Sequence, residues 1–503
     1  MKALISSGVM GLCCTPMKFT SGSWAFTRRS FVWGAVSAFG TMALPSFGGD
    51  NRPIMTFGVV SDVHIGGRKE APERLEFALR WLKGRNVDAV LCPGDIAHSG
   101  LKSQFEKFAS VWQEVFPGSR DARGRKVELM VSTGNHDVAP EWTKKGKSAE
   151  WCRENLMETA EDFNRIWPRL FGESFEIDWR KEVKGIVFLG TQWTSLKPDV
   201  ESFVRAQSAT IDRTRPFFYC QHEHPRGTCH GSFGCGFDDG RSVRALSPFP
   251  NAVAITGHSH CTLADERSVW QGAFTSIGAG CTHEGGMSFD YDNCSAFWHP
   301  NSKTKLMGPL NDPAAWSGDP QGGCFEFIEV FADHLVVHRR SSVVDGPIGP
   351  DWIVPIPARK DGPFDFAVRK QKRLAPQFAA NAALKVEVCP LGHSLESNAR
   401  RGEPCVYLAF PCADAECSAR VFDYVVTADS GGKEVARRTV FAPGGTHPLT
   451  CANVPGECLF SLKELSGAKV VKFTVVPREC FGNSGRPLLS AAVVFRDGAS
   501  VRQ

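Results

Sequence analysis

The sequence lacks several features that would place it in other classes of protein. No two of its 18 cysteines are separated by two residues, which disfavours a zinc ribbon or a thioredoxin-like redox site. No internal repeat is apparent. An excess of charge is also missing after the N-terminus, because the four basic residues before Asp50, where no acid occurs, account for the whole net charge of +4. This neutral balance makes nucleic acid an unlikely partner.

Residues 1–49 carry a pattern typical of an export signal. Thr27 to Trp33 (TRRSFVW) contains paired arginines with an aromatic residue two positions on, and a weakly hydrophobic stretch follows. A membrane anchor is the alternative, but the stretch is diluted by Gly and Ser and is shorter than the roughly 20 residues of a spanning helix. We therefore expect twin-arginine export to the periplasm or the extracellular space, with Ala43 as a candidate cleavage position. No stable membrane span is expected once the signal is removed, whereas an uncleaved signal would tether the protein to the membrane.

The length of 503 residues predicts two domains and an additional segment. Residues 50–345 alternate strand-like and helix-like patterns, which predicts a mixed α/β sandwich, with 274–277, 324–330 and 334–339 completing its second sheet. Residues 346–380 hold six prolines and are expected to form an extended connector rather than a helix or a central strand. Residues 381–503 show short alternating runs separated by turns, which predicts an immunoglobulin- or fibronectin-like β-sandwich. Seven cysteines in this last part predict some disulfides there.

Five short polar motifs each follow a run that reads as a strand. The carboxyl ends of strands in an α/β sheet are where such proteins place their chemistry, and these motifs end in oxygen or imidazole ligands. They are SDVH at 61–64, GDIAH at 94–98, GNHD at 134–137, QHEHP at 221–225 and GHSH at 257–260.

Carboxylate, amide and imidazole ligands in this number suit a pair of metal ions. Two adjacent divalent cations can clamp a phosphate ester and lower the pKa of a shared hydroxide, which becomes the nucleophile. Such a pair needs a bridging carboxylate, and mixed imidazole and oxygen ligands favour iron, manganese or zinc over calcium. The sequence thus indicates a binuclear metal site.

The five motifs together resemble those of the calcineurin-like metallophosphoesterases, over roughly residues 55–265. The resemblance implies a four-layer α/β/β/α sandwich, two Fe, Mn or Zn ions, a phosphate-ester substrate and His136 as the catalytic residue that contacts phosphate or protonates the leaving oxygen. It also implies a first metal held by Asp62, His64 and His260, a second held by Asn135, His222 and His258, and Asp95 as the bridge. The run LADERSVWQGAFTSIGAG after the last motif resembles a subset of exported bacterial members that carry a β-sandwich after the catalytic domain.

Several assignments around these motifs stay open in the sequence. His222 is favoured as the ligand of the QHEHP motif, with His224 as the alternative. Asp137 is expected to orient His136 or its loop, and His98 is expected either to line the substrate pocket or to lie at the surface. Asp265 and Arg267 either brace the metal histidines or form a surface ion pair. The segments 228–240 and 282–320 are expected to overhang the site and select the substrate.

The leading hypothesis is an exported phosphoesterase acting on phosphomonoesters or phosphodiesters. A catalytically inactive binding or adhesion protein on the same fold is the alternative, and the loss of a ligand would favour it. No ligand is lost here, and a protein that merely stores metal would have no use for His136.

Overall fold

The computed structural model describes residues 52–230, 237–283, 306–307, 323–393, 402–413, 420–442, 449, 454–496 and 499–502. The export signal expected at 1–49 lies outside these residues. Most of the expected overhanging segment 282–320 and the centre of the segment 228–240 also lie outside them. Among the described residues, no helix is both long and apolar enough to span a membrane.

The first sheet of the α/β part has six strands in the order β13-β12-β11-β1-β2-β3. β1, β2 and β3 are parallel and provide three of the motif-bearing strand ends, whereas β11, β12 and β13 are antiparallel. The strands are β1 (Met55–Val59), β2 (Ala89–Pro93), β3 (Glu128–Ser132), β11 (Cys324–Val330), β12 (His334–Ser341) and β13 (Trp352–Pro355).

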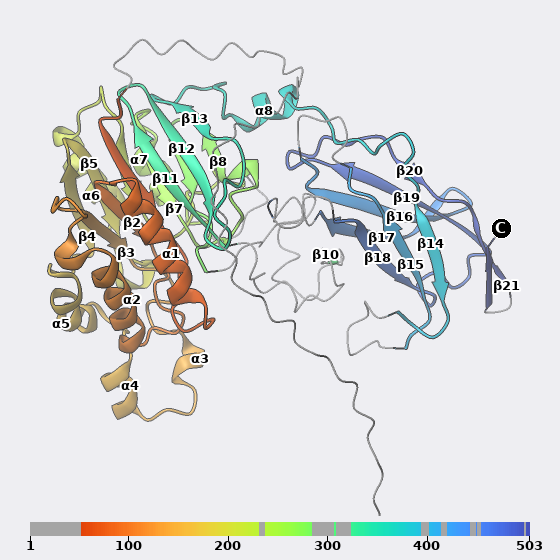
Figure 1. Cartoon of the computed structure of the whole chain (residues 1–503), viewed down its shortest axis with the longest axis horizontal. Helices are drawn as coiled ribbons and strands as arrows, with labels where there is room; N and C mark the ends of the chain where they lie inside the picture. The colour runs from red at the N-terminus through yellow and green to blue at the C-terminus, as the bar shows by residue number, and fades with distance from the viewer. Residues whose placement is uncertain are drawn as a thin grey trace, which may run out of the picture. The chain divides into compact units, whose positions relative to one another are not determined.

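The helices α1 (Ala71–Gly84), α2 (Lys102–Val115) and α5 (Ala160–Phe171) cover the outer face of this sheet. Their apolar side chains recur at helical spacing, so that each helix buries one side against the strands. Figure 1 shows α1 and α2 alongside this sheet.

The second sheet also has six strands, in the order β4-β5-β6-β7-β9-β8. The helices α6 (Val200–Gln207) and α7 (Arg241–Leu246) pack against its outer face. Its strands are β4 (Asp178–Val183), β5 (Ile186–Thr191), β6 (Phe217–Cys220), β7 (Ala252–Thr256), β8 (Val269–Gln271) and β9 (Thr275–Gly278).

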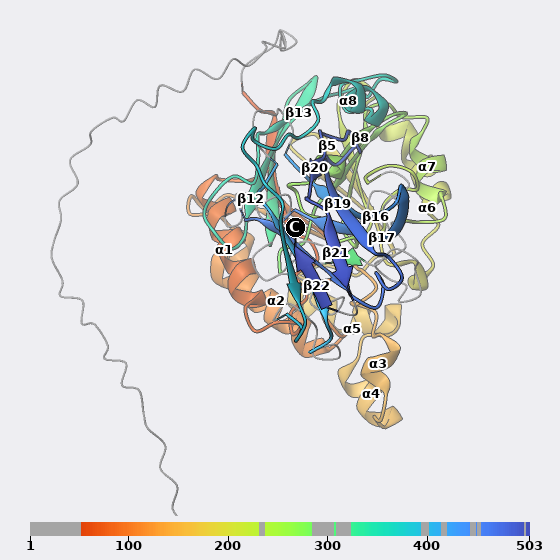
Figure 2. The ribbon, with the colours of Figure 1, turned by 90° about the vertical axis from the view of Figure 1, so that its right-hand side faces the viewer.

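The inner faces of the two sheets share one hydrophobic core. Phe57 of β1, Phe188 of β5 and Phe218 of β6 meet there with ring centroids 4.8 to 5.4 Å apart. Figure 2 shows α1 and α2 on one side of the sheets and α6 and α7 on the other. The predicted four-layer α/β/β/α sandwich is therefore confirmed.

The structure corrects the predicted pairing of two strands. β11 and β12 do not complete the second sheet, because β11 pairs antiparallel with β1, with Met55 opposite Val330. β11 is buried on both faces, with Phe325 and Phe327 toward the helices and Ile328 toward the other sheet. An apolar run of this kind fits either sheet, so the sequence pattern does not determine the partner.

The segment 346–380 also differs from the expected connector. It contributes the edge strand β13, which pairs with β12, and the helix α8 (Phe366–Lys372). The Asp365 side chain accepts hydrogen bonds from the backbone N–H groups of Ala367 and Val368, which caps the helix. The prediction of a connector without a helix is therefore wrong, while the domain boundaries stay predictions.

The C-terminal part is all β, as predicted. One sheet has the order β10-β17-β16-β19-β21-β22 with β20 beside β19, and the other has the order β14-β15-β18. Between them lies a separate core that includes Val406, Tyr424 and Phe473. The strands are β10 (Leu306–Met307), β14 (Lys385–Cys389), β15 (Cys405–Phe410), β16 (Asp423–Ser430), β17 (Lys433–Phe441), β18 (Gly456–Ser461), β19 (Val470–Arg478), β20 (Leu488–Leu489), β21 (Val493–Arg496) and β22 (Ala499–Arg502).

The disulfides expected in this part stay a prediction. Cys389 and Cys405 lie directly opposite each other on β14 and β15, and Cys458 is buried. Cys417 and Cys451 lie outside the described residues.

Candidate metal centre

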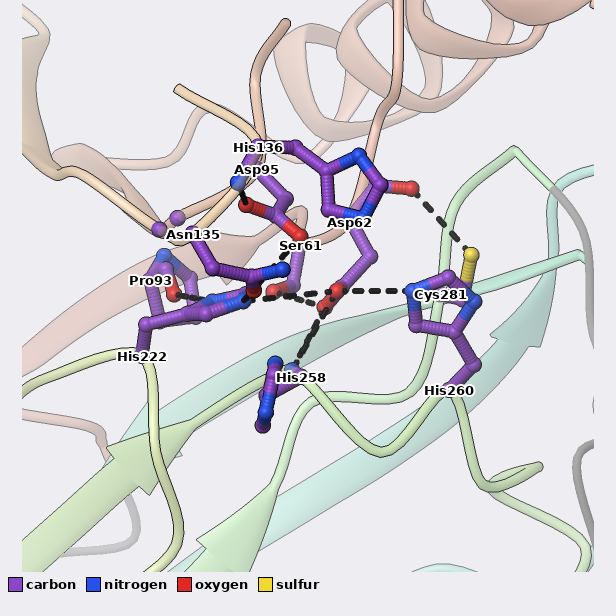
Figure 3. Close-up of polar contacts among 12 residues, drawn as sticks. Ser61, Asp62, Pro93, Asp95, Asn135, His136, His222, His258, His260 and Cys281 are labelled. Atoms are coloured by element: carbon purple, nitrogen blue, oxygen red, sulfur yellow. Dashed lines mark hydrogen bonds and ion pairs between the residues drawn. The ribbon is translucent and has the colours of Figure 1, made fainter. Parts of the chain in front are cut away.

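All seven predicted metal ligands converge at the carboxyl ends of the parallel strands. Asp62 and His64 follow β1, Asp95 follows β2, and Asn135 follows β3 in the first sheet. His222 follows β6, while His258 and His260 follow β7 in the second sheet. Figure 3 labels six of the seven, all but His64, and shows them gathered at one place. The two sheets therefore each supply one side of a single site.

One group of potential ligands consists of Asp62, His64, Asp95 and His260, whose ligand atoms lie within 4.8 Å of one another. The Nε2 atom of His260 is 3.0 Å from both Asp62 Oδ1 and His64 Nε2. His64 Nε2 is also 3.6 Å from Asp95 Oδ2. Two carboxylates and two imidazoles therefore point at one position.

The second group consists of Asp95, His222 and His258. His222 Nε2 lies 3.2 Å from Asp95 Oδ2 and 3.2 Å from the Asn135 Oδ1 atom. Asp95 belongs to both groups, so its carboxylate lies between them.

Hydrogen bonds at the far side of the rings orient the potential ligands. The Nδ1–H group of His222 donates to the Pro93 carbonyl at 2.7 Å, which directs Nε2 into the site. The backbone N–H of His258 donates to the Asp62 carboxylate at 3.1 Å. The His222 side chain thus holds the end of β2, and the Asp62 side chain holds the loop after β7.

His136 is held beside Asp95 from two directions. Its backbone N–H donates to Asp95 Oδ1 at 2.8 Å, and its Nδ1–H donates to the His98 carbonyl at 2.7 Å. This leaves Nε2 for a substrate or a proton transfer. The His136 ring lies 4.6 Å from that of His64.

The backbone is strained at five of the predicted ligands. Each has a positive φ, a conformation that costs about 1–3 kcal/mol for a residue other than glycine. Such strain persists only where surrounding contacts determine the conformation, and it gathers at functional sites. The five are Asp62 (φ 50°), His64 (48°), Asp95 (52°), His258 (70°) and His260 (53°).

Two motif glycines allow close approach of the strand ends. A side chain at Gly134 would collide with the Asp95 carboxylate, and one at Gly257 would collide with Ser61 Oγ and Asp62 Oδ2. These positions require glycine because there is no space for a Cβ atom.

The buried charged groups of the site shift one another's pKa values. Burial raises the pKa of Asp95, but His222 and His64 outweigh it and hold the pKa well below its ordinary value. Burial lowers the pKa of His222, but Asp95 and Asp62 outweigh it and raise the pKa to about 9. In His258, burial and the nearby His222 lower the pKa to about 3. The site therefore combines anionic carboxylates with imidazoles of very different basicity.

The structure brings His222 rather than His224 to the cluster. His224 is fully buried, and its Nδ1 and Nε2 atoms bond to Thr256 Oγ1 at 2.6 Å and to Ser259 Oγ at 2.7 Å. His224 thereby fixes the loop that carries His258 and His260.

Asp137 and His98 act on the loops around the ligands. Asp137 accepts hydrogen bonds from the backbone N–H groups of Ala97 at 2.7 Å and Gly134 at 2.9 Å, which joins the loops after β2 and β3. His98 is half-buried, and its Nδ1 lies 3.4 Å from the Nδ1 of His64. His98 therefore contacts a predicted ligand and is not a surface residue remote from the site.

The pair Asp265–Arg267 is not a surface ion pair. Both side chains are 1% exposed, and their charged atoms are 2.7 Å apart. Asp265 also faces His230 at 3.6 Å, while the Arg267 guanidinium lies 4.5 Å from the Phe422 ring centroid. The pair thus joins the segment after the GHSH motif to the C-terminal β part.

Sequence reasoning missed Cys281 and His283. The Cys281 thiol donates to the Asp62 carbonyl at 3.1 Å and also bonds to His260. The His283 ring lies 5.4 Å from the ring of His64. Both residues follow the carboxyl end of β9, a parallel strand, so the positional signal that identified the other motifs was present here too.

The α/β part of the chain is similar to known proteins. Residues 55–262 match the family model of the calcineurin-like phosphoesterases. Solved structures that match include a dimetal phosphatase from Danio rerio (10% identity, 60% of this chain and 99% of that chain, TM-score 0.36). A purple acid phosphatase from yellow lupin, Lupinus luteus, also matches (13% identity, 61% and 54%, TM-score 0.37). Vacuolar protein sorting 29 from Cryptosporidium parvum is a further match (11% identity, 60% and 96%, TM-score 0.28). No curated protein sequence matches the chain.

The α/β part is therefore that of a metal-dependent phosphoester hydrolase. The resemblance to the calcineurin-like phosphoesterases that the sequence predicts is confirmed over residues 55–262.

Proposed function

We propose that the protein is an exported binuclear-metal phosphoesterase that hydrolyses phosphomonoesters or phosphodiesters. The position of Asp95 carries this proposal, because its carboxylate belongs to both groups of potential ligands. A carboxylate in that position can bridge two cations, and all the other ligand slots are filled by Asp, Asn or His. Iron, manganese or zinc fits this mixture of imidazole and oxygen donors.

Asp62, His64 and His260 would hold the first cation, and Asn135, His222 and His258 the second. When bound, the two cations supply charge that offsets the phosphoryl oxygens and acidifies a water molecule. The bond from the Nδ1–H group of His222 to the Pro93 carbonyl leaves the Nε2 atom of this ring facing the site.

His136 is proposed to donate the proton that the leaving oxygen needs. Its Nδ1–H group is already engaged with the His98 carbonyl, so Nε2 is the atom that can transfer a proton. His136 adjoins Asn135, which places it next to the second ligand group. Export is proposed on the paired arginines Arg28 and Arg29 alone.

The test combines metal analysis with an activity panel. Purified protein reconstituted with iron, manganese or zinc should bind two ions per chain and hydrolyse at least one phosphomonoester or phosphodiester. Asp95→Asn should lower the occupancy of both positions, whereas His64→Ala should mainly empty one.

Each variant serves as a control for the other, since both alter a buried ligand. Full double occupancy in Asp95→Asn would contradict the bridging role. A reconstituted protein that binds two ions and hydrolyses no ester would contradict the proposed activity.

A further inference from the structure

Trp142 is exposed beside the catalytic position. It lies on the short helix α3 (Glu141–Lys144), and its side chain is 56% exposed. The other large apolar side chains that are exposed among the described residues are all aliphatic. The Trp142 ring lies 5.2 Å from that of His136, in an edge-to-face arrangement. Figures 1 and 2 show α3 and α4 (Ala149–Asn155) projecting from the α/β part.

A second indole borders the predicted ligands His222 and His258. Trp193 follows β5 and is half-buried, with its ring 5.9 Å from that of His222 and 5.7 Å from that of His258. Neither Trp142 nor Trp193 belongs to a hydrophobic core cluster of the described residues. Packing of the fold therefore does not account for either ring.

The two indoles border the predicted metal centre from separate segments. Trp142 adjoins His136, whose ring lies beside His64 of the first ligand group, while Trp193 adjoins His222 and His258 of the second. An ester whose phosphate sits over the centre would have its organic part near one or both rings. Exposed aromatic faces stabilise planar groups such as nucleobases by stacking.

We propose that Trp142 and Trp193 form a binding surface for a planar aromatic group of the substrate, so that the preferred esters carry a nucleobase or a comparable ring. This inference rests on the proposed phosphoesterase function. Trp142 is the outer, exposed part of the surface, and Trp193 is the part next to the ligand histidines.

The experiment compares two esters with the same type of leaving group. Adenosine 5′-monophosphate and ribose 5-phosphate both release a primary alkoxide, and they differ in the base. The ratio of their kcat/KM values therefore reports recognition of the ring and not the chemistry of bond cleavage. The ratio should exceed one, and Trp142→Ala should lower it by roughly fivefold to a hundredfold.

Two further variants separate stacking from a loss of structure. Trp142→Phe keeps an aromatic face and should retain most of the ratio. Trp151→Ala provides the matched control, because Trp151 lies on the neighbouring α4 under the Lys147 ammonium group, 4.6 Å away. That variant should leave the ratio unchanged.

Adenosine binding, measured by calorimetry on the full chain, provides a readout that does not depend on turnover. It should weaken in Trp142→Ala and persist in Trp151→Ala. An unchanged ratio together with unchanged adenosine binding in Trp142→Ala would overturn the inference. If no ester is hydrolysed at all, the proposed function fails, while the binding measurement still decides for or against the aromatic surface.

Discussion

Glu326 offers a quantitative test of the electrostatics between the two sheets. It lies in the middle of β11, opposite Arg339 of β12, and is fully buried. Neither carboxylate oxygen has a hydrogen-bond partner among the described residues. The Arg339 guanidinium instead donates to the Leu263 carbonyl at 2.8 Å and to Glu266 at 2.9 Å. Burial therefore dominates and raises the pKa of Glu326 to about 8, with Arg339 offsetting only part of the effect.

The raised pKa makes the stability of the folded protein depend on pH. Between pH 4.5, the ordinary pKa, and about pH 8, the folded chain keeps a proton on Glu326 that the unfolded chain releases. This contribution to the free energy of unfolding is fully present below pH 4.5 and is lost as the pH rises to about 8. At about 1.4 kcal/mol per pKa unit, the loss is at most about 5 kcal/mol.

Glu326→Gln replaces the protonated acid with a neutral group of similar shape, so this pH dependence should disappear. Urea unfolding, followed by tryptophan fluorescence at pH 5 and pH 8, measures it. The variant should gain stability over the parent protein on going from pH 5 to pH 8, by up to about 4 kcal/mol. Glu329→Gln is the control, because Glu329 lies on the same strand and bonds to His338 at 3.0 Å near the surface. Parallel pH dependences for Glu326→Gln and the parent protein would refute this account of the buried carboxyl.

Two further predictions concern the site itself. His136→Ala should slow the hydrolysis of alkyl phosphate esters far more than that of nitrophenyl esters, with both metals still bound. Proton donation to the leaving oxygen typically accelerates a reaction roughly a hundredfold to ten-thousandfold, and only a basic leaving group needs it. Equal losses of kcat on both esters would show that His136 positions phosphate or supports its loop. Gly257→Ala should lower the metal content, since the added methyl group collides with Ser61 and Asp62. Gly84→Ala is the control and should retain the metal, because a Cβ atom at Gly84 would have no atom within 4 Å. Full occupancy in Gly257→Ala would show that the two loops can separate without disturbing the ligands.

The convergence of the predicted ligands could be foreseen because each of them follows the carboxyl end of a strand. An apolar run that ends in a short polar motif locates a strand end, and parallel strands bring their carboxyl ends to one edge. Asp62, Asp95 and Asn135 were located in this way, and the choice of His222 over His224 agrees with the geometry. Cys281 was overlooked although it obeys the same rule, because the run GAGC carries only one potential ligand.

Strand pairing and helix breaks were harder to predict from the sequence. The region 148–171 reads as one helical region, but the structure has α4 up to Asn155 and a new helix α5 from Ala160. The Thr159 side chain accepts a hydrogen bond from the Asp162 N–H and so caps α5, a local signal that could have been recognised in advance. The placement of β11 beside β1 depends on contacts far apart in the sequence, which no local pattern contains.

The strain and the charge at the site have a common consequence. Five predicted ligands hold a positive φ, and the carboxylates of Asp62 and Asp95 are buried next to His222 and His260. Asp62 contributes to raising the pKa of both imidazoles, so in the protein alone protons on His222 and His260 offset the buried negative charge. A divalent cation requires neutral imidazole, and it therefore replaces these protons when it binds. The surrounding hydrogen bonds, such as those that the Asp137 carboxylate accepts from Ala97 and Gly134, support the strained backbone. These contacts orient the predicted ligands within the fold, and cations that bind there would displace the protons on His222 and His260.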